Sequence, residues 1–349
     1  MGALDLEMMK CVVKELPGDG HVVLTERPVP EVGDFDVLIR VKAVAICGTD
    51  VHIKHWDDYA QKRMNPPTIL GHEYAGEVVK VGKGVTSVKI GDIVNSDSHL
   101  VCGTCDLCLN GHSDVCYNTI VIGVHRDGAF AEYICIPESA VNQCDASMPI
   151  EQLALMEPLG VAVHAAMEFP IAVKKVAVIG CGPIGCMGVA IAKTLGAAQI
   201  IAIELNEKRA EMALEMGASV IVNPAKEDTV ARVKELSGGN GVDVVLDFSG
   251  NAGAIMTALD YVKPDGCIVA AGLGPNPVTL PWENFVTKGI CIKGISGREI
   301  PRTWERMKGL FAAGLDISKV ITHVMPLEDY EKGLELMETG QCGKVVLKP

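Results

Sequence analysis

The stretch VAVIGCGPIGCMGVAIAKTLGA, residues 176–197, decides the fold of the second half of the chain. An apolar run is followed at once by glycines spaced Gly-x-Gly-x-x-Gly, and then by residues with helical periodicity. Glycines at this spacing allow a tight turn and let a pyrophosphate approach the N–H groups at a helix N-terminus. The spacing alone is a weak signal. Its place between a strand and a helix predicts a dinucleotide site at Gly180, Gly182 and Gly185.

Glu204 strengthens this prediction, because it ends the next apolar strand, 19 residues after Gly185. An acidic side chain there accepts hydrogen bonds from ribose hydroxyls and repels a 2′-phosphate, so NAD is favoured over NADP. Arg209 lies close in sequence and tempers that preference, since an arginine can accommodate a phosphate. The alternative is an ordinary glycine turn followed by a solvated glutamate.

Around this stretch, apolar strands alternate with helical segments from about Lys175 onward. Runs such as QIIAIEL, VDVVLDFSG, CIVAAGL and ICIKGI are continuously apolar, which is typical of parallel strands covered on both faces. We therefore expect a doubly wound α/β domain. Residues 1–150 instead show short β-type runs, for example VLIRVKAVAI and EYAGEVVKVG, broken by Gly, Pro, Asn and Asp.

The end of the chain resembles neither half strongly. It reads as a helix (TWERMKGLFAAG), a strand (VITHVMPL), a helix (DYEKGLELMETG) and a strand (KVVLKP), which we expect to pack on the first domain. The predicted domains are therefore residues 1–156 with 300–349, and residues 157–299. A length of 349 residues suits two domains, each with its own apolar core.

The composition excludes several classes of function. A net charge of −13 disfavours a nucleic-acid or anionic-membrane partner. No run of 18 apolar residues is present, and the start MGALDLEMMK lacks the order of a signal peptide, so a cytoplasmic location is expected. Thirteen cysteines, an odd number, suggest reduced thiols and metal ligands rather than a disulfide framework.

Four of the cysteines form a tight cluster, C-x2-C-x2-C-x7-C, in a segment rich in Gly, Asn and Asp. They are Cys102, Cys105, Cys108 and Cys116. Four thiolates on a polar loop suit a closed tetrahedral zinc site that stabilises the loop. Iron–sulfur ligation is the competing interpretation, but the fourth cysteine is too distant and no proline follows it, so zinc is preferred.

Other metal-capable residues are scattered along the chain. Cys47 lies at a strand end in AICGTD, His72 and Glu73 are adjacent in GHEYAGEV, and Glu157 lies in MEPLG. Each is unremarkable alone, because a lone cysteine is usually a small core residue and a lone glutamate a solvated charge.

Taken together, these motifs resemble the zinc-containing, medium-chain alcohol dehydrogenases over essentially the whole chain. The resemblance rests on CGTDVH (47–52), GHEYAGEV (71–78), the four-cysteine loop, EPLGVAVH (157–164) and GCGPIG (180–185). Within this family the chain is most similar to the L-threonine 3-dehydrogenases, through ICGTDVHI, WDDYAQK, DVCYNTIVIGVHRDGAFAEY and GISGREIPRTW. The family fold implied is a GroES-like, β-rich catalytic domain joined to a Rossmann domain with a parallel sheet.

The resemblance also implies roles for individual residues. Cys47, His72 and Glu73 would hold a catalytic zinc, with Glu157 close enough to coordinate or exchange. Thr49 and His52 would relay the substrate proton to solvent, and His99 would lie near the substrate. The residues implied along NAD, besides the three glycines of the turn, are Pro183, Ile184, Glu204, Arg209, Ala271, Gly272, Leu273, Ile295 and Ser296.

Three hypotheses for the function follow. The first is oxidation of the L-threonine hydroxyl by NAD, giving 2-amino-3-oxobutanoate, with two zinc sites in a homotetramer or dimer. The second is a polyol, sugar, sugar phosphate or diol dehydrogenase of the same family, favoured because MEPLG stands where threonine enzymes commonly carry Asp-Pro-Phe. The third is a zinc-free or non-catalytic dinucleotide-binding protein, which the presence of Cys47, His72 and Glu73 disfavours.

Overall fold

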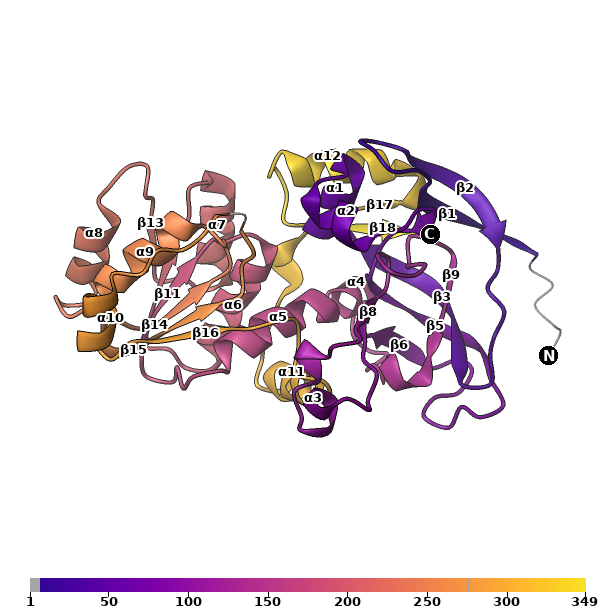
Figure 1. The fold of residues 1–349 in the computed structure, drawn as a ribbon, viewed down its shortest axis with the longest axis horizontal. Coiled ribbons are helices and arrows are strands. Elements are labelled where there is room, and N and C mark those ends of the chain that lie inside the picture. The colour runs from indigo at the N-terminus through magenta and orange to yellow at the C-terminus, as the bar shows by residue number, and fades with distance from the viewer. Residues whose placement is uncertain (1–6, 275) are drawn as a thin grey trace. The chain divides into compact units, whose positions relative to one another are not determined.

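The chain forms two compact units in the computed structural model, which describes residues 7–274 and 276–349 (Figure 1). The first unit contains the chain up to Glu157 together with Ile321–Pro349, and the second contains Pro158–Val320. Of the start MGALDLEMMK, residues 1–6 lie outside the described residues. No helix in the described part of the chain is long and apolar enough to cross a membrane.

The second unit is built on a six-stranded parallel sheet with the order β13-β12-β11-β14-β15-β16. Its strands are β11 (Lys175–Ile179), β12 (Gln199–Ile203), β13 (Val220–Val222), β14 (Val242–Asp247), β15 (Val262–Ala270) and β16 (Cys291–Gly294). The order reverses between β11 and β14, and ligands of open α/β sheets bind at such a switch point. The doubly wound domain predicted from the sequence is confirmed.

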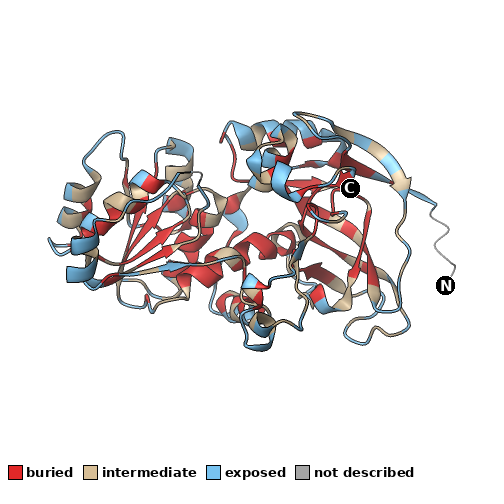
Figure 2. Cartoon of the chain, in the orientation of Figure 1, coloured by how far each residue is buried: buried red, intermediate tan, exposed pale blue. Residues whose placement is uncertain are grey.

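Helices connect these parallel strands. They are α6 (Pro183–Thr194), α7 (Glu207–Met216), α8 (Thr229–Leu236), α9 (Ala252–Tyr261) and α10 (Trp282–Thr287). The central strands are buried along most of their length, as the red arrows of this unit show in Figure 2. Burial on both faces explains why their sequences are continuously apolar instead of alternating.

Residues 300–320 lie in the second unit, which corrects the predicted assignment of the whole tail from 300 onward to the first domain. Helix α11 (Arg302–Ala312) buries Trp304, Met307 and Leu310, and the short helix η3 (Ser318–Val320) packs on α6 and α7. The amphipathic pattern predicted the helix correctly. It did not reveal which apolar core the buried face of that helix joins.

The first unit is β-rich, as predicted. Its largest sheet has seven strands in the order β10-β6-β5-β3-β18-β17, with β9 also paired to β3. These are β3 (Asp36–Ala45), β5 (Glu73–Val81), β6 (Ile93–Ser96), β9 (Tyr133–Pro137), β10 (Val141–Gln143), β17 (Ile321–Pro326) and β18 (Lys344–Lys348). The tail therefore returns to the first unit through β17, α12 (Tyr330–Glu338) and β18, as Figure 1 shows in yellow.

Two smaller sheets and several short helices complete the first unit. The small sheets contain β1 (Met8–Lys14), β2 (Val22–Pro28) and β4 (Thr68–Ile69), and β7 (His99–Leu100) and β8 (Ile120–Val121). The helices are α1 (Gly48–His55), α2 (Asp58–Arg63), α3 (Asp106–Leu109), α4 (Ile150–Ala154) and the start of α5 (Met156–Ala166). Sequence analysis predicted none of these helices. Helices α1 to α4 have only four to eight residues, which is too short to show a clear helical period.

Candidate active site

Strand pairing brings Cys47, His72 and Glu73 together in the first unit. Cys47 follows β3 and is the N-cap of α1, and Glu73 begins β5 directly after His72. Strands β3 and β5 are antiparallel with Ala45 opposite Glu73, so the end of one strand meets the start of the other. One ligand atom from each of the three side chains lies within 4.8 Å of the others.

This group of donors fits a zinc ion. A thiolate, an imidazole and a carboxylate are the ligand types of catalytic zinc, and a tetrahedral ion with bonds of about 2.0–2.3 Å needs ligand atoms roughly 3.5 Å apart. His72 and Glu73 are buried, and the Nδ1 atom of His72 has no hydrogen-bond partner in the structure. A buried polar atom without a partner is costly, and a cation bound by this imidazole would reduce that cost.

Lys344, at the start of β18, is a buried partner that sequence analysis missed. Its Nζ atom lies 2.6 Å and 2.5 Å from the two carboxylate oxygens of Glu73 and donates to the Ile46 carbonyl at 3.2 Å. Burial raises the pKa of Glu73, and the Lys344 ammonium opposes that rise. The contact joins residues 271 positions apart, so no local pattern could have indicated it.

Asp50 is a second buried carboxylate that the sequence did not reveal as part of this centre. Its Oδ2 atom accepts a hydrogen bond from the backbone N–H of Cys47 at 2.9 Å, which fixes the first turn of α1. Burial raises the pKa of Asp50, while the nearby His72 acts in the opposite direction. Asp50 therefore supports both Cys47 and the electrostatics around His72.

Glu157, at the start of α5, is not among the three side chains whose ligand atoms lie within 4.8 Å of one another. Its Oε1 atom accepts a hydrogen bond from the hydroxyl of Ser98, and the residue is buried. Its charge acts on Glu73 and Lys344, where it raises the pKa of both groups. Glu157 thus belongs to the same electrostatic environment, although the structure shows it bonded to a serine.

The predicted relay residues lie on α1. Thr49 is in its first turn, and His52 is more than half exposed, with Nδ1 2.6 Å from the Asp57 carboxylate. The ring of Tyr59 on α2 lies with its centroid 6.0 Å from that of His52; the sequence had placed Tyr59 only within a family motif. His99 lies on β7, where its backbone N–H donates to Asp97.

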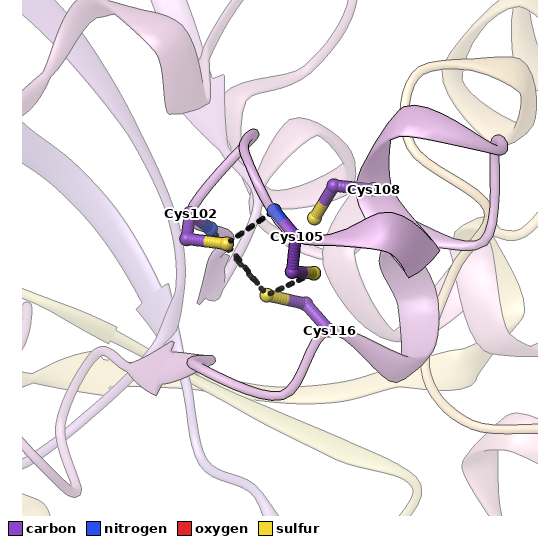
Figure 3. Close-up of side chains that lie close together, drawn as sticks. All are labelled: Cys102, Cys105, Cys108 and Cys116. Atoms are coloured by element: carbon purple, nitrogen blue, oxygen red, sulfur yellow. Dashed lines mark hydrogen bonds between the residues drawn. The ribbon is translucent and has the colours of Figure 1, made fainter.

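The four cysteines of the 102–116 loop converge as predicted (Figure 3). The Sγ atom of Cys116 lies 3.5 Å from that of Cys102 and 3.9 Å from that of Cys105. Hydrogen bonds from the backbone N–H of Thr104 and from Asn118 lower the pKa of Cys102 to about 5. A low thiol pKa provides the thiolate that zinc binds, so this loop fits a second, closed metal site.

The glycine turn of the second unit has the backbone geometry that the sequence predicts for a dinucleotide site. Gly180 has a φ of +78°, and a Cβ on Gly185 would lie 2.0 Å from the Gly180 carbonyl oxygen. Nothing lies within 4 Å of the position that a Cβ on Gly182 would take. Backbone conformation and packing therefore explain the first and third glycines, and open space for a ligand explains the second.

A cavity of about 510 Å³ adjoins this turn and is lined in part by Glu204 and Arg209. The Glu204 carboxylate accepts hydrogen bonds from the backbone N–H groups of Cys181, Leu205 and Asn206 at 2.7–2.8 Å. The Arg209 Nε atom is buried and has no hydrogen-bond partner. The cavity is thus lined in part by a carboxylate that three backbone N–H groups hold in place and by an arginine whose Nε atom has no hydrogen-bond partner.

The remaining predicted cofactor residues lie at the start of helix α6 and in the two segments that follow strands β15 and β16. Pro183 and Ile184 open α6, directly after the glycine turn. Ala271–Leu273 and Ile295–Ser296 follow β15 and β16, which are paired in parallel with Ala270 opposite Gly294. Both segments therefore leave the sheet at its carboxyl edge, although none of these seven residues lines the cavity. Ser249 and Asn251, which follow β14, line it but were not predicted.

Comparison with known proteins identifies the family. Residues 33–146 match the alcohol dehydrogenase GroES-like domain, and residues 183–313 match the zinc-binding dehydrogenase model. L-threonine 3-dehydrogenase of Caldanaerobacter subterraneus is 48% identical over 98% of this chain and 99% of its own. The enzyme of the same name from Escherichia coli is 42% identical over 97% and 99% of the two chains.

Solved structures with the same fold include other dehydrogenases. Galactitol-1-phosphate dehydrogenase of Escherichia coli superposes with a TM-score of 0.89 at 27% identity, covering 98% of this chain and 100% of that one. 2R,3R-butanediol dehydrogenase of Bacillus subtilis has a TM-score of 0.86 at 29% identity, covering 98% and 99%. The predicted fold class and the predicted cofactors, NAD and zinc, agree with these matches, and the chain belongs to the family of zinc-dependent, NAD(P)-using alcohol dehydrogenases.

Proposed function

We propose that the protein oxidises the secondary hydroxyl of L-threonine to the ketone of 2-amino-3-oxobutanoate, with NAD as hydride acceptor. The observation that carries this proposal is the Cys47, His72 and Glu73 cluster in a chain 42–48% identical to several L-threonine 3-dehydrogenases over nearly its whole length. Zinc at such a cluster supplies Lewis acidity, which makes a bound alcohol easier to deprotonate. NAD supplies the hydride acceptor.

Side chains of the first unit are proposed to bind the metal, transfer the substrate proton and contact the substrate. Cys47, His72 and Glu73 hold the metal, and Glu157 is a further carboxylate that can exchange with it. Thr49 accepts the substrate proton at Oγ1, and His52, which is exposed, passes a proton to solvent. His52 suits this task because an imidazole can both accept and donate a proton, and because the Asp57 carboxylate orients its Nδ1 atom. His99 is proposed to lie near the substrate.

Glu204 supports NAD over NADP. Its carboxylate is held in place by three backbone N–H groups, so it is fixed before a cofactor binds. A fixed carboxylate accepts hydrogen bonds from ribose hydroxyls and repels a 2′-phosphate. The guanidinium of Arg209 lines the same cavity and can bind a 2′-phosphate, which limits the preference for NAD over NADP.

A polyol, sugar phosphate or diol substrate is the second candidate. Its support is the similarity of fold to galactitol-1-phosphate and 2R,3R-butanediol dehydrogenases. We therefore propose an assay of NADH formation with L-threonine, sorbitol, galactitol 1-phosphate and 2,3-butanediol, each with and without a chelator. Turnover of L-threonine alone supports the first proposal, and turnover confined to the other alcohols refutes it.

We also propose that the protein is a cytoplasmic homotetramer without nucleic-acid or membrane partners. The edge strand β16 and the exposed side chains of Trp282 and Val286 offer the second unit a surface that another copy can cover. The net charge of −13 disfavours anionic partners, and all 13 cysteines are free thiols, which fits a reducing compartment. Light scattering on the purified protein tests the tetramer, and fractionation of cells tests the location.

A further inference from the structure

A histidine of helix α5 holds the segment that follows strand β16 in the second unit. The His164 side chain is buried, and its Nδ1 atom lies 3.1 Å from the carbonyl oxygen of Gly297. A carbonyl oxygen can only accept a hydrogen bond, so Nδ1 carries the proton and donates. Gly297 has a φ of +52°, which glycine adopts without strain, so the bond is made where the chain turns.

Helix α5 makes a second contact with the same segment. Gly160 lies four residues before His164 and therefore on the same face of the helix. A Cβ on Gly160 would lie 2.3 Å from the Cδ atom of Arg298, whose side chain is buried. The glycine at position 160 thus leaves room for Arg298, and one face of α5 contacts two consecutive residues of the segment.

Both ends of this segment, residues 295–299, are also anchored. The backbone N–H of Ile295 donates to the carbonyl of Ala270 on β15 at 3.0 Å. The Glu299 carboxylate accepts a hydrogen bond from the Arg306 guanidinium of α11 at 2.6 Å. His164 acts between these anchors, at the turn, so its loss would free the middle of the segment while the ends stay in place.

The position of residues 295–299 in the fold indicates which ligand they serve. They leave the parallel sheet at its carboxyl edge, where open α/β sheets bind their ligands, and a dinucleotide places one nucleotide on each side of the switch point. Glu204 directly follows β12, so the proposed adenosine site belongs to the side formed by β11, β12 and β13. The nicotinamide nucleotide is then expected on the side formed by β14, β15 and β16, which includes residues 295–299.

We propose that His164 is a positioning residue for the nicotinamide half of NAD, because its Nδ1–H group holds the turn at Gly297 in the conformation that the cofactor meets. The inference rests on NAD as the cofactor and on the proposed place of Ile295 and Ser296 along it. His164 ends the motif EPLGVAVH, in which only Glu157 had a proposed role. A segment that the ligand must first order binds that ligand more weakly than a segment ordered beforehand.

Variants of His164 test which ring nitrogen matters. His164→Leu removes the donor, and His164→Gln carries its amide nitrogen one bond further from the backbone, near the place of Nε2. Both should weaken NADH binding about tenfold in calorimetric titrations of the zinc-loaded protein. His164→Asn has its amide nitrogen bonded to Cγ, as Nδ1 is, and should keep the NADH affinity within about twofold. The Asn and Gln variants carry the test should His164→Leu fold poorly.

Titrations with ADP separate positioning from a general structural role. ADP carries the adenosine and two phosphates but no nicotinamide nucleotide, so its affinity should not change in any His164 variant. Glu204→Ala is the reference, because it should weaken the binding of ADP and of NADH alike. Glu168→Gln is the matched control, since Glu168 Oε2 lies 3.9 Å from His164 Nε2 and its charge can be removed without touching the bond to Gly297. This control is expected to bind NADH with unchanged affinity.

The unfavourable outcomes are distinct. Failure of the wild-type protein to bind NADH would refute the cofactor and, with it, the role of His164. The titration needs no alcohol, so its result does not depend on L-threonine as the substrate. Normal NADH affinity in His164→Leu and His164→Gln would refute only the role of His164. Equal losses of ADP and NADH affinity in these variants, or a loss in His164→Asn or Glu168→Gln as large as that in His164→Leu, would refute it as well.

Discussion

Lys344→Met is the substitution that most sharply tests the electrostatics of the catalytic centre. In the metal-free protein it leaves the Glu73 carboxylate buried without its cation, and breaking a buried pair in this way costs about 3–5 kcal/mol. For units of this size each kcal/mol lowers the melting temperature by about 2–4 °C, so we expect a fall of roughly 6–20 °C. Bound zinc should reduce the loss, because the ion supplies a positive charge beside Glu73.

The pH dependence of this variant follows from the Glu73 pKa. Burial raises the pKa of Glu73 in the folded protein and Lys344 opposes the rise, so removing Lys344 leaves a carboxyl with a folded pKa above its unfolded value. Such a group binds more protons in the folded state, and stability falls as pH rises between the two pKa values. Lys344→Met should therefore be closest to the wild-type protein in stability near pH 5 and furthest from it near pH 8.

Thermal and urea unfolding of the chelator-treated protein measures both effects. The matched control is Lys348→Met on the same strand, whose partly exposed pair with Glu151 should contribute less than about 1 kcal/mol. Glu73→Gln combined with Lys344→Met removes the buried charge and should restore most of the lost stability. An unchanged melting temperature in Lys344→Met at pH 8, or no recovery in the double variant, would refute the reasoning.

Three further predictions concern the other sites. Cys105→Ser should lower the zinc content by one ion per chain and the melting temperature by several degrees, because the 102–116 loop depends on its metal. Elemental analysis measures the zinc content and calorimetry the melting temperature. Retention of both zinc ions would contradict this prediction. Glu204→Ala should weaken NAD binding about 10- to 100-fold in calorimetric titrations, because the carboxylate is lost and three backbone N–H groups lose their acceptor. The ratio of NAD affinity to NADP affinity should also fall. An unchanged ratio would count against the role assigned to Glu204. Gly182→Ala should abolish NAD binding without lowering the melting temperature. Gly185→Ala should lower both NAD binding and the melting temperature, because its added Cβ would lie 2.0 Å from a backbone oxygen, whereas the Cβ at position 182 would meet nothing. Equal melting temperatures for the two variants would contradict this account.

The features that the sequence predicted are those encoded locally. The glycine turn and the four-cysteine loop each lie within about 20 residues, and their residue types have few other uses at that spacing. The apolar strands of the second unit were equally clear, because burial on both faces removes polar residues from them. Cys47, His72 and Glu73 needed the family resemblance, since only the pairing of β3 with β5 joins them.

The features that the sequence missed depend on contacts between distant or short segments. Lys344 looked like an ordinary strand residue, and its partner Glu73 is 271 positions away. The Tyr59 ring lies 6.0 Å from the His52 ring because a left-handed residue, Trp56, reverses the chain between two helices too short to show a period. Residues 300–320 were assigned to the wrong unit because an amphipathic pattern identifies a buried face but not the core that buries it.

The most direct test of the central claim is the zinc content of Cys47→Ser compared with that of the wild-type protein. If Cys47, His72 and Glu73 hold a catalytic ion and the four-cysteine loop holds a structural one, the wild-type chain binds two zinc ions and the variant binds one. The variant should also lose turnover of L-threonine while it binds NAD with unchanged affinity. Two zinc ions in Cys47→Ser, or full turnover by a chain that holds only one, would contradict the account.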